Sequence, residues 1–386
     1  MTNPTVLPGA TLGVLGGGQL GRMFVHAAQS LGYRTAVLDP DADSPAGLVS
    51  HLHVRCGYLD ADGLAQMGAC AAITTEFENV PAQALTALGE KLPCAPEGAS
   101  VAVCQDRAAE KAHFVACGVP CAPHAVIETP EQLAAVADAL LPGILKTARL
   151  GYDGKGQVRV ATRAELARAW DELQRVPCVL EKMLPLAFEV SVIVARGRDG
   201  AVVALPVQRN LHRDGILAVT EAPAPGVTDA LAAQALANAQ RIAEGLGYVG
   251  VLCVEFFVLQ DCSLVANEMA PRPHNSGHYS IDACDVSQFE LQVRCMAGLP
   301  LVAPRLHSSA VMLNILGDLW FDERGCERTP AWDRVLALPG AHLHLYGKTS
   351  ARRGRKMGHL TITAATPQAA RETALAACAV LGLPAY

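Results

Sequence analysis

The sequence predicts an α/β protein with a parallel sheet at its N-terminal end and a small β-rich part at its C-terminal end. Residues 11–100 alternate short apolar runs with helical stretches, which is the β-α-β pattern of a parallel sheet with right-handed crossovers. Residues 142–300 mix strands and helices around a Gly-rich loop and a hairpin. The tail from Val311 combines Pro and Gly breaks with short strands and an Ala-rich terminal helix, which indicates a separate small domain.

The composition excludes several classes of protein. The 386 residues are 51% hydrophobic and 18% charged, which is ample for a core and favours two or three domains over disorder. No apolar run approaches the ~20 residues that a membrane helix needs, and no basic segment precedes an apolar one as in a signal peptide. The net charge of −6 disfavours a general nucleic-acid binder. The 13 cysteines lack a C-x-x-C pair, so we expect reduced thiols and a cytoplasmic protein.

The first elements that we expect are strands over 11–15, 34–38 and 71–75, with a helix over 21–31. Between the first strand and this helix, Gly16-x-Gly18-x-x-Gly21 has the outline of a dinucleotide-binding fingerprint, and Asp39 ends the next strand. Glycines let the backbone approach an anion, and N–H groups at a helix start attract phosphate. The motif therefore leaves three alternatives open, namely NAD(P), a phosphosugar and a purely structural turn.

The central region begins with a helix over 106–117 and continues into a strand that ends in Lys146. A lysine at the end of an apolar strand must be paired or solvated, so it favours phosphate chemistry. A Gly-rich loop follows, and such a loop can fold over a polyphosphate, although it lacks the ending of a Walker A motif. Its alternative interpretation is a mobile surface turn. The loop consists of Gly151, Tyr152, Asp153, Gly154, Lys155, Gly156 and Gln157.

Two glutamates, Glu181 and Glu189, flank a break at Pro185. A strand, a turn and a second strand would place the backbone of residues 182–184 in a hinge, where amide and carbonyl groups can read adenine and a carboxylate can bind ribose hydroxyls. The alternative is a pair of surface glutamates.

The hairpin over 254–270 carries two carboxylates and an amide. If Asp261 and Cys262 form a two-residue turn, Glu255 faces Glu268 with Cβ atoms about 4.5–5.5 Å apart. Two carboxylates at that distance repel each other unless one is protonated or a cation lies between them. Asn267 adds an oxygen donor, and Mg²⁺ bound with substrate phosphates typically takes one or two protein carboxylates. The alternatives are an exposed pair at a strand end, or a register slip that turns the two side chains to different faces.

Taken in order, these motifs resemble the ATP-grasp superfamily. The resemblance rests on Lys146, GYDGKGQ at 151–157, EKML at 181–184, Glu189, NLHRDGIL at 210–217, and Glu255 with Asn267 and Glu268. Four further strings narrow it to the family of N5-carboxyaminoimidazole ribonucleotide synthetases: GGGQLGRM at 16–23, TTEFENVP at 74–81, APRPHNSGH at 270–278 and GRKMGHL at 354–360. The match runs in order from about residue 12 to about residue 363.

The resemblance implies an ATP-grasp fold and a carboxylation reaction. ATP would phosphorylate bicarbonate to carboxyphosphate. Either carboxyphosphate or CO₂ released from it in the site would then carboxylate 5-aminoimidazole ribonucleotide, with Mg²⁺ and without biotin. The implied domains are an N-terminal Rossmann-like, substrate-binding domain at 1–105, an ATP-grasp domain at 106–310 with a lid at about 115–185, and a small β-rich domain at 311–386. The family is commonly a cytoplasmic homodimer, and we expect no nucleic acid and no membrane as partners.

The resemblance also assigns site residues. The nucleotide would be bound by Arg107, Lys146, Gly151, Tyr152, Asp153, Gly154, Lys155, Gly156, Gln157, Glu181, Lys182, Met183, Leu184, Glu189, His212, Asn267 and Glu268. Mg²⁺ would be bound by Glu255 and Glu268. The ribonucleotide would be bound by Gly18, Gln19, Leu20, Glu76, Asn79, Arg272, Asn275, Ser276, Lys348 and Arg355. The catalytic set would be Tyr152, Asp153, Arg272, His274, Asn275 and Lys348.

Three alternatives for the function stay beside this one. Another ATP-grasp ligase, such as an amino-acid ligase, a formate-using purine transferase or a biotin carboxylase, is disfavoured by the FENVP and HNSGH strings. An NAD(P)-dependent oxidoreductase built on the first glycine loop leaves the second glycine loop and the carboxylate hairpin unexplained. A nucleic-acid-binding module using the cations of residues 348–356 is disfavoured by the acidic net charge, and we expect Arg352 and Arg353 there to be solvated.

Overall fold

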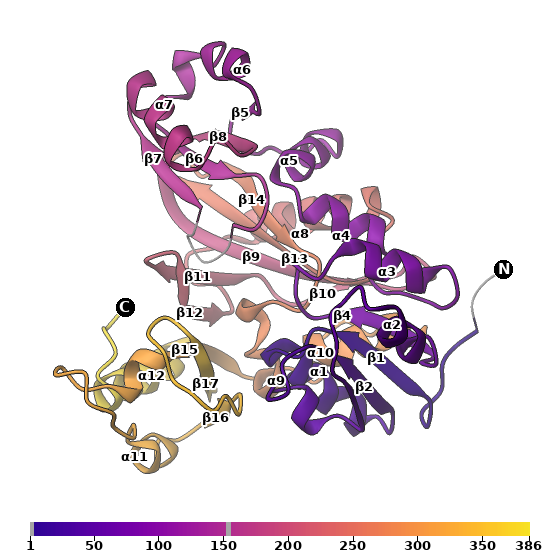
Figure 1. The fold of residues 1–386 in the computed structure, drawn as a ribbon. Coiled ribbons are helices and arrows are strands. Elements are labelled where there is room, and N and C mark those ends of the chain that lie inside the picture. Colours follow the sequence, from indigo (N-terminus) through magenta and orange to yellow (C-terminus); the bar gives the residue numbers. More distant parts are fainter. Residues whose placement is uncertain (1–3, 152–155) are drawn as a thin grey trace.

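The structure is a computed structural model that describes residues 4–151 and 156–386, and three β-sheets organise it (Figure 1). The described segments contain the predicted α/β arrangement, with a parallel sheet first, a mixed region next and a β-rich end. None of the helices in these segments combines the length and apolar character needed to cross a membrane.

The N-terminal sheet has four parallel strands in the order β3-β2-β1-β4. The strands are β1 (Thr11–Leu15), β2 (Arg34–Leu38), β3 (Leu52–Val54) and β4 (Ala72–Thr75), and the helices are α1 (Gln19–Ser30), α2 (Ala61–Met67), α3 (Ala82–Gly89) and α4 (Gly98–Cys104). The first two predicted strands are confirmed to the residue. The predicted helix over 21–31 begins two residues earlier, at Gln19, because Gly18 is the N-cap residue and helical backbone starts directly after it.

A second, antiparallel sheet has the order β5-β8-β6-β7 and forms the upper part of the molecule in Figure 1. Its strands are β5 (His124–Ile127), β6 (Gly143–Thr147), β7 (Gln157–Val160) and β8 (Cys178–Lys182), with α5 (Arg107–Ala116), α6 (Pro130–Ala134) and α7 (Arg163–Glu172) nearby. The carboxylate of Asp106 accepts hydrogen bonds from the N–H groups of Ala108 and Ala109, so it caps α5 and fixes where Arg107 begins the helix.

The third sheet has nine strands, and β10 (Val202–Ala204) pairs only with β9 (Leu186–Arg196). The other strands are β11 (Gln208–Arg213), β12 (Ile216–Ala222), β13 (Gly250–Leu259), β14 (Leu264–Ala270), β15 (Ser309–Leu316), β16 (Ala341–Leu345) and β17 (Lys356–Ala364). Because β12 pairs with β15, the predicted C-terminal strands continue this central sheet rather than forming a sheet of their own. The helices α11 (Trp332–Leu336) and α12 (Pro367–Leu381) accompany them.

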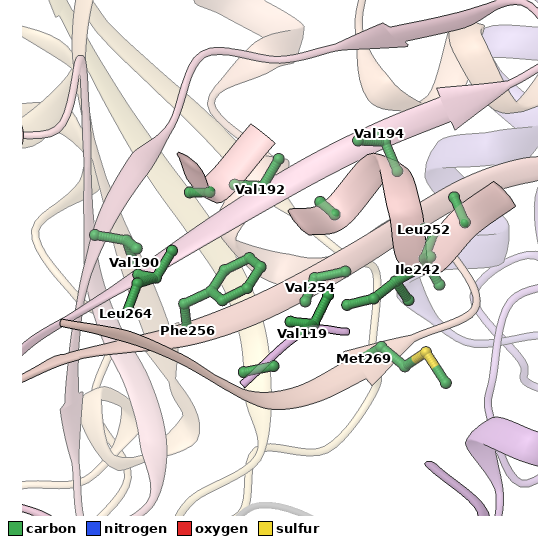
Figure 2. Packing of buried hydrophobic residues seen from close by; sticks show 14 of the residues in the cluster. Val119, Val190, Val192, Val194, Ile242, Leu252, Val254, Phe256, Leu264 and Met269 are labelled. Carbon is green, nitrogen blue, oxygen red and sulfur yellow. The ribbon is translucent and has the colours of Figure 1, made fainter. Parts of the chain in front are cut away.

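The main core lies between the central sheet and α8 (Asp229–Gly245). Figure 2 shows valines from β9 and β13 packed with Ile242 of α8 and with Phe256, and every side chain of this cluster is less than a tenth exposed. Burial of each large apolar side chain contributes about 1.5–3 kcal/mol to stability, and this burial fixes the strands that carry the candidate ligands.

The helix α10 (Gln288–Ala297) joins the central sheet to the N-terminal sheet. Its Phe289 and Val293 belong to the same buried cluster as Leu12 of β1 and Phe24 of α1. The buried amide of Gln292 extends the junction by binding Thr74, Ala95 and Val251. The short helix α9 (Ser280–Ala283) precedes it, and 3₁₀ turns lie at Gly47–Val49, Asp138–Leu140, Asn275–Gly277 and Gly317–Trp320.

Candidate active site

The hairpin of β13 and β14 opposes Glu255 and Glu268, as predicted, but by a different route. The prediction of a two-residue turn at Asp261 and Cys262 is wrong. Leu259 and Ser263 close a three-residue turn, in which Cys262 has a φ of 65°. That turn shifts the register by one residue, and a β-bulge at Asn267 shifts it back before the carboxylates are reached.

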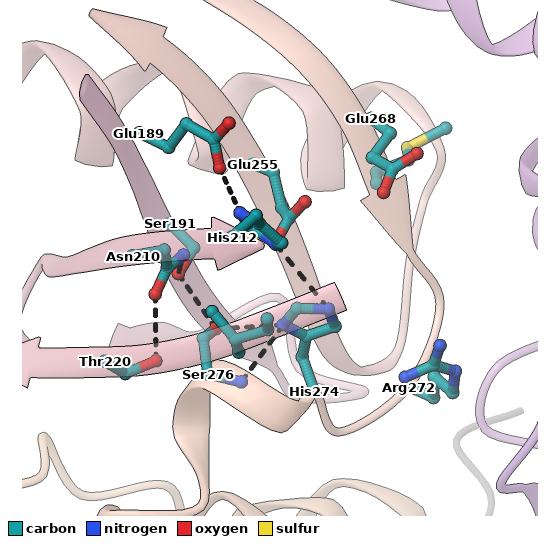
Figure 3. Close-up of polar contacts among 12 residues, drawn as sticks. Glu189, Ser191, Asn210, His212, Thr220, Glu255, Glu268, Arg272, His274 and Ser276 are labelled. Carbon is teal, nitrogen blue, oxygen red and sulfur yellow. Dashed lines mark hydrogen bonds and ion pairs between the residues drawn. The ribbon is translucent and has the colours of Figure 1, made fainter. Parts of the chain in front are cut away.

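The two carboxyl groups lie in different environments (Figure 3). The side chain of Glu255 is 12% exposed, whereas that of Glu268 is 45% exposed. Burial raises the pKa of Glu255, and the negative charges of Glu268 and Glu189 raise it further against the opposing pull of His212. Among the described residues, the buried Oε1 of Glu255 and Oδ1 of Asn267 have no hydrogen-bond partner. These two orphaned oxygens beside a second carboxylate fit an oxygen-ligated cation such as Mg²⁺.

A compact group of cations surrounds Glu181, which is only 3% exposed. Its Oε2 lies 3.0 Å from Lys146 Nζ, and its Oε1 lies 3.4 Å from Lys111 Nζ and 3.9 Å from Arg107 Nη1. Burial alone would raise the pKa of Glu181, but the three cations outweigh it and lower the pKa. Arg107 also reaches to 3.7 Å from Glu268, so it links this group to the hairpin.

The predicted hinge lies between the end of β8 at Lys182 and the start of β9 at Leu186. Two of its N–H groups are already used, because Lys182 donates to Pro123 and Met183 donates to Pro142. The N–H of Leu184 has no acceptor among the described residues. Of the three candidate hinge residues, Leu184 is therefore the one that can offer its N–H to a ligand.

On the neighbouring strands, Glu189 of β9 and His212 of β11 form a short hydrogen bond between Oε2 and Nδ1 (Figure 3). Burial would lower the pKa of His212, but the bond to Glu189 and the charges of Glu255 and Glu268 raise it to about 9. His212 is therefore a cation at neutral pH, and it faces the carboxylates of the hairpin.

A buried chain of hydrogen bonds leads from β12 across β11 and β9 to His274 (Figure 3). The hydroxyl of Thr220 donates to Asn210 at 3.0 Å, the Asn210 amide donates to Ser191 at 2.8 Å, and Ser191 donates to Ser276 at 2.8 Å. Ser276 Oγ lies 2.9 Å from His274 Nδ1. All four residues of the chain before His274 are at most 5% exposed, so their bonds do not compete with water.

These contacts fix the tautomer of His274. The backbone N–H of Ser276 can only donate, and it points to His274 Nδ1 at 3.3 Å. Nδ1 is therefore the acceptor, and the proton of the neutral ring is on Nε2, which lies 3.7 Å from Glu255 Oε1. Burial, followed by the charge of Arg272, lowers the pKa of His274 well below its usual value. The ring is thus a neutral donor through Nε2 and is not a base at that atom.

Arg272 is a cation with a dedicated partner, and its side chain is 14% exposed. Its Nε forms a short hydrogen bond to Oε2 of Glu78, and its Nη1 donates to the carbonyl of Pro273 at 3.1 Å. Burial alone would raise the pKa of Glu78, but Arg272 outweighs it and lowers the pKa. Asn275, two residues further on from Pro273, has a buried Nδ2 with no partner among the described residues. Arg272 and Asn275 therefore supply a guanidinium and an unpartnered amide donor on either side of Pro273 and His274 along the chain.

The first glycine loop is occupied by the protein's own carboxylates. Glu76 accepts from the N–H groups of Gly18 at 2.9 Å and Gly21 at 3.0 Å, and Asp39 accepts from Gly17 at 2.7 Å. A Cβ at Gly18 would come within 2.7 Å of the Glu76 carboxylate, so this glycine is needed for the close approach of a side chain. Asp39 also binds Tyr58, so it is not available for a ribose, and this disfavours the dinucleotide alternative.

Gln19 and Leu20, two predicted ribonucleotide ligands, lie at the start of the same helix and are not bound by these carboxylates. The N–H groups of Gln19 and Leu20 have no acceptor among the described residues. The other predicted ligand nearby, Asn79, is half-buried. Among the N–H groups of Gly16 to Gly21, those of Gln19 and Leu20 are therefore the ones left to bind a ligand.

The C-terminal cations lie on the segment between β16 and β17. Lys348 Nζ donates to the carbonyl of Lys356 at 2.6 Å, and Arg355 Nη1 donates to the carbonyl of Ser350 at 2.8 Å. Burial, followed by the charge of Arg355, lowers the pKa of Lys348 to about 8. Arg352 and Arg353 are exposed, as expected.

The second glycine loop is described only at its ends. Gly151 and Gly156 are half-buried, Gln157 is exposed, and the carbonyl of Gly156 accepts from Thr147 at 2.8 Å. The candidates in its middle, Tyr152, Asp153, Gly154 and Lys155, lie outside the described residues.

Sequence reasoning missed several residues of this site. Lys111 and Glu78 carried a weak signal, because a charged residue within an apolar helix or beside a strand end must find a partner. Asn210 entered the sequence analysis only as part of the NLHRDGIL string. Ser191 and Thr220 carried no signal, because each lies on a strand whose alternation is read from its apolar neighbours.

Comparisons with known proteins match all three parts of the chain to family models. Residues 9–105 match the ribonucleotide synthetase preATP-grasp domain, residues 112–289 the ATP-grasp domain, and residues 310–373 the phosphoribosylaminoimidazole carboxylase C-terminal domain. The N5-carboxyaminoimidazole ribonucleotide synthase of Brucella melitensis is 44% identical over 94% of this chain and 98% of its own.

Solved structures agree over nearly the whole length. The ADP complex of an N5-carboxyaminoimidazole ribonucleotide synthetase superposes with a TM-score of 0.90 at 38% identity, covering 98% of both chains. The Aspergillus clavatus N5-carboxyaminoimidazole synthase, in complex with ADP and 5-aminoimidazole ribonucleotide, has a TM-score of 0.87 at 33% identity and covers 99% of this chain and 100% of its own.

Proposed function

The chain belongs to the N5-carboxyaminoimidazole ribonucleotide synthase family of ATP-grasp enzymes, and from that premise we propose how its residues perform the reaction. It is an ATP-grasp ligase of purine biosynthesis that carboxylates 5-aminoimidazole ribonucleotide. The observation that carries the assignment of roles is the opposed pair Glu255 and Glu268. Glu255 has a buried oxygen without a hydrogen-bond partner among the described residues, and Glu268 lies 3.7 Å from Arg107 of the cations around Glu181.

The reaction has two displacements. An oxygen of bicarbonate attacks the γ-phosphorus of ATP, the bond to the β-phosphate oxygen breaks, and ADP leaves carboxyphosphate behind. The exocyclic amine of the ribonucleotide then bonds to the carboxyl carbon, the bond from that carbon to the phosphate oxygen breaks, and phosphate leaves. The amine gives up one proton, for which we propose Asp153 as the acceptor or as the group that orients the amine.

We assign the binding of Mg²⁺ to Glu255 and Glu268, with the Asn267 amide oxygen beside it. The support is the donor set itself, which consists of two carboxylates and an amide and is the kind that this hard cation prefers. The buried Glu255 Oε1 and Asn267 Oδ1 have no hydrogen-bond partner among the described residues. Bound Mg²⁺ would neutralise negative charge on the ATP phosphates.

We assign the nucleotide to the space between the hinge and the hairpin. The free N–H of Leu184 reads the adenine ring, and Glu189 accepts from the ribose hydroxyls. Lys146 and Arg107 bind the phosphates of ATP. Both cations now have Glu181 as their acidic partner, and the bound phosphates would supply part of that negative charge instead. The residues Gly151–Gln157 would close over the phosphates through their backbone N–H groups.

We assign His274, Arg272 and Asn275 to the carboxyphosphate. The neutral ring of His274 donates through Nε2, Arg272 supplies a positive charge, and the Asn275 amide supplies an unpartnered donor. Hydrogen-bond donors that are fixed in place before the anion forms stabilise it without having to reorganise. The chain of hydrogen bonds from Thr220 contributes here, because it holds the His274 ring in one orientation.

We assign the 5-phosphate of the ribonucleotide to the N–H groups of Gln19 and Leu20 together with Lys348 and Arg355. Glu76, Asn79 and Ser276 would contact the remainder of the substrate. The combination of a helix N-terminus with two cations is a strong site for a dianion.

We further propose domains at 1–105, 106–310 and 311–386, a cytoplasmic location and a homodimer. The unpaired state of all thirteen cysteines supports a reducing compartment. Sedimentation equilibrium would test the dimer, and a single species with the mass of one chain would rule it out.

The assay is release of ADP from ATP, Mg²⁺ and bicarbonate, measured with and without 5-aminoimidazole ribonucleotide. We expect ADP release to depend on the ribonucleotide and the product to carry the label of ¹⁴C-bicarbonate. ADP release that proceeds equally with formate or an amino acid, and leaves the ribonucleotide unlabelled, would contradict the assignment.

A further inference from the structure

Outside the active site, histidines gather where the C-terminal strands meet α9. His344 of β16 and His359 of β17 are directly paired across the two strands, and their rings stack with centroids 4.5 Å apart. Asp282 of α9 reaches the same place, with Oδ2 at 2.9 Å from His344 Nε2. Each of the three side chains offers a ligand atom within 4.8 Å of the others.

One ring nitrogen of this cluster lacks any partner. His359 is fully buried, and its Nδ1 lies 3.0 Å from the hydroxyl of Tyr346. Its Nε2 has no hydrogen-bond partner among the described residues. A buried polar atom without a partner is costly, so it indicates a ligand or ion that the polypeptide itself does not provide.

From this geometry we propose that Asp282, His344 and His359 bind a divalent transition-metal ion, of which Zn²⁺ is the natural occupant. Two imidazoles and a carboxylate are a nitrogen-rich donor set that suits Zn²⁺ and its neighbours in the first row, whereas Mg²⁺ takes oxygen ligands. The proposal is independent of the reaction and of the carboxylate hairpin.

The surrounding groups complete the arrangement. With a metal on Nε2, the Nδ1–H of His359 donates to the Tyr346 oxygen, which fixes the ring. His342 lies 3.7 Å from the other oxygen of Asp282, where it can orient that carboxylate. The side chains of His344 and His342 are 29% and 41% exposed, so an ion can enter from solvent.

The ligand atoms must move together on binding. At metal–ligand distances of about 2.0–2.2 Å, the ligand atoms of a tetrahedral zinc site stand about 3.3 Å apart. Rotation of the Asp282 and His344 side chains would bring their ligand atoms to His359 Nε2, and the 2.9 Å between Asp282 Oδ2 and His344 Nε2 would widen slightly. The buried His359 stays in place. The bound ion would join β16 and β17 to α9, a helix that follows the His274–His278 segment of the active site.

The test is metal binding by the full-length, untagged chain after treatment with a chelator and in the presence of excess Mg²⁺. Isothermal titration with Zn²⁺ should give one tight equivalent, and His344→Ala should weaken it by more than the roughly 10–100-fold that loss of an outer partner costs. Since His344 is partly exposed, the variant should fold, which circular dichroism checks. His307→Ala removes an exposed histidine elsewhere and should bind as the parent does.

Cysteine is the competing ligand, because Cys262 and Cys326 are exposed thiols. Titration with Co²⁺ separates the two donor types, since thiolate ligation adds a charge-transfer band that nitrogen and oxygen ligands lack. We expect visible d–d bands without that band, and their loss in His344→Ala. A charge-transfer band that disappears in the double variant C262S/C326S, or unchanged Zn²⁺ affinity in His344→Ala, would overturn the proposal.

Discussion

Two neighbouring parts of the active site handle charge in opposite ways. Around Glu181, three cations meet one buried carboxylate. Around the hairpin, the carboxylates of Glu189, Glu255 and Glu268 meet the single imidazolium of His212. Arg107 stands between the two sets, 3.9 Å from Glu181 and 3.7 Å from Glu268.

The difference shows what each part lacks. The cationic set has an excess of positive charge, which the phosphates of ATP would balance, and the acidic set has an excess of negative charge, which a metal ion would balance. Leaving buried charges uncompensated lowers stability, so a protein retains such sets where ligands supply the missing charge.

The largest effect is expected from Glu268→Gln. The change removes one negative charge from the acidic set, so turnover should fall roughly 10³-fold, because metal binding contributes several kcal/mol to charge stabilisation. Affinity for the ribonucleotide, measured by calorimetry, should stay within about twofold. Glu172→Gln removes an exposed glutamate far from the set and is the control. Equal losses of turnover and ribonucleotide binding would mean that the two sets are not separate.

Next in size is Glu181→Gln, which removes the carboxylate from the cationic set. Three buried cations then repel one another, and the free energy of unfolding should fall by about 3 kcal/mol, measured with urea. Saturating ATP should recover part of this loss in the variant, because the phosphates substitute for the missing charge. If ATP stabilises parent and variant equally, the phosphates do not bind at these cations.

A smaller effect tests a cation outside both sets. Lys348 has a pKa lowered to about 8, so it carries its charge below that pH and loses it above. The KM for the ribonucleotide should therefore rise by roughly tenfold per unit well above pH 8, with kcat changed less. In Lys348→Met this dependence should disappear and KM should be high at every pH. A parent profile without the rise would remove Lys348 from the phosphate site.

The smallest effect is expected from Ser191→Ala, which breaks the chain of bonds to His274. The variant loses both hydrogen bonds of Ser191 Oγ, the one from Asn210 and the one to Ser276. Loss of the bond that reaches Ser276 should reduce kcat about fivefold, near 1 kcal/mol, while the KM for ATP stays the same. The ¹⁵N shifts of His274 should show a weaker preference for the proton on Nε2. Ser100→Ala, at a buried serine outside the site, should leave both unchanged. Unaltered ¹⁵N shifts in Ser191→Ala would mean that the backbone N–H of Ser276 alone fixes the ring.

The hairpin illustrates how far the sequence could lead. The pairing of Glu255 with Glu268 was predicted from an assumed two-residue turn, yet the turn has three residues and a bulge at Asn267 restores the pairing. Two local features that sequence periodicity does not reveal cancelled each other. The same limit applies to the chain of bonds from Thr220, which depends on strand neighbours far apart in the sequence.

The sequence by itself determined the kinds of elements, their order and the motif residues, because apolar periodicity and glycine placement act over a few residues at a time. Only the tertiary structure decided which charges meet. In the folded chain, Glu76 binds the first glycine loop and Lys111 lies beside Glu181. The central sheet continues into the C-terminal strands, and Asp282, His344 and His359 lie close together. These contacts join residues that are distant along the chain, and only packing selects among the many partners that such residues could have.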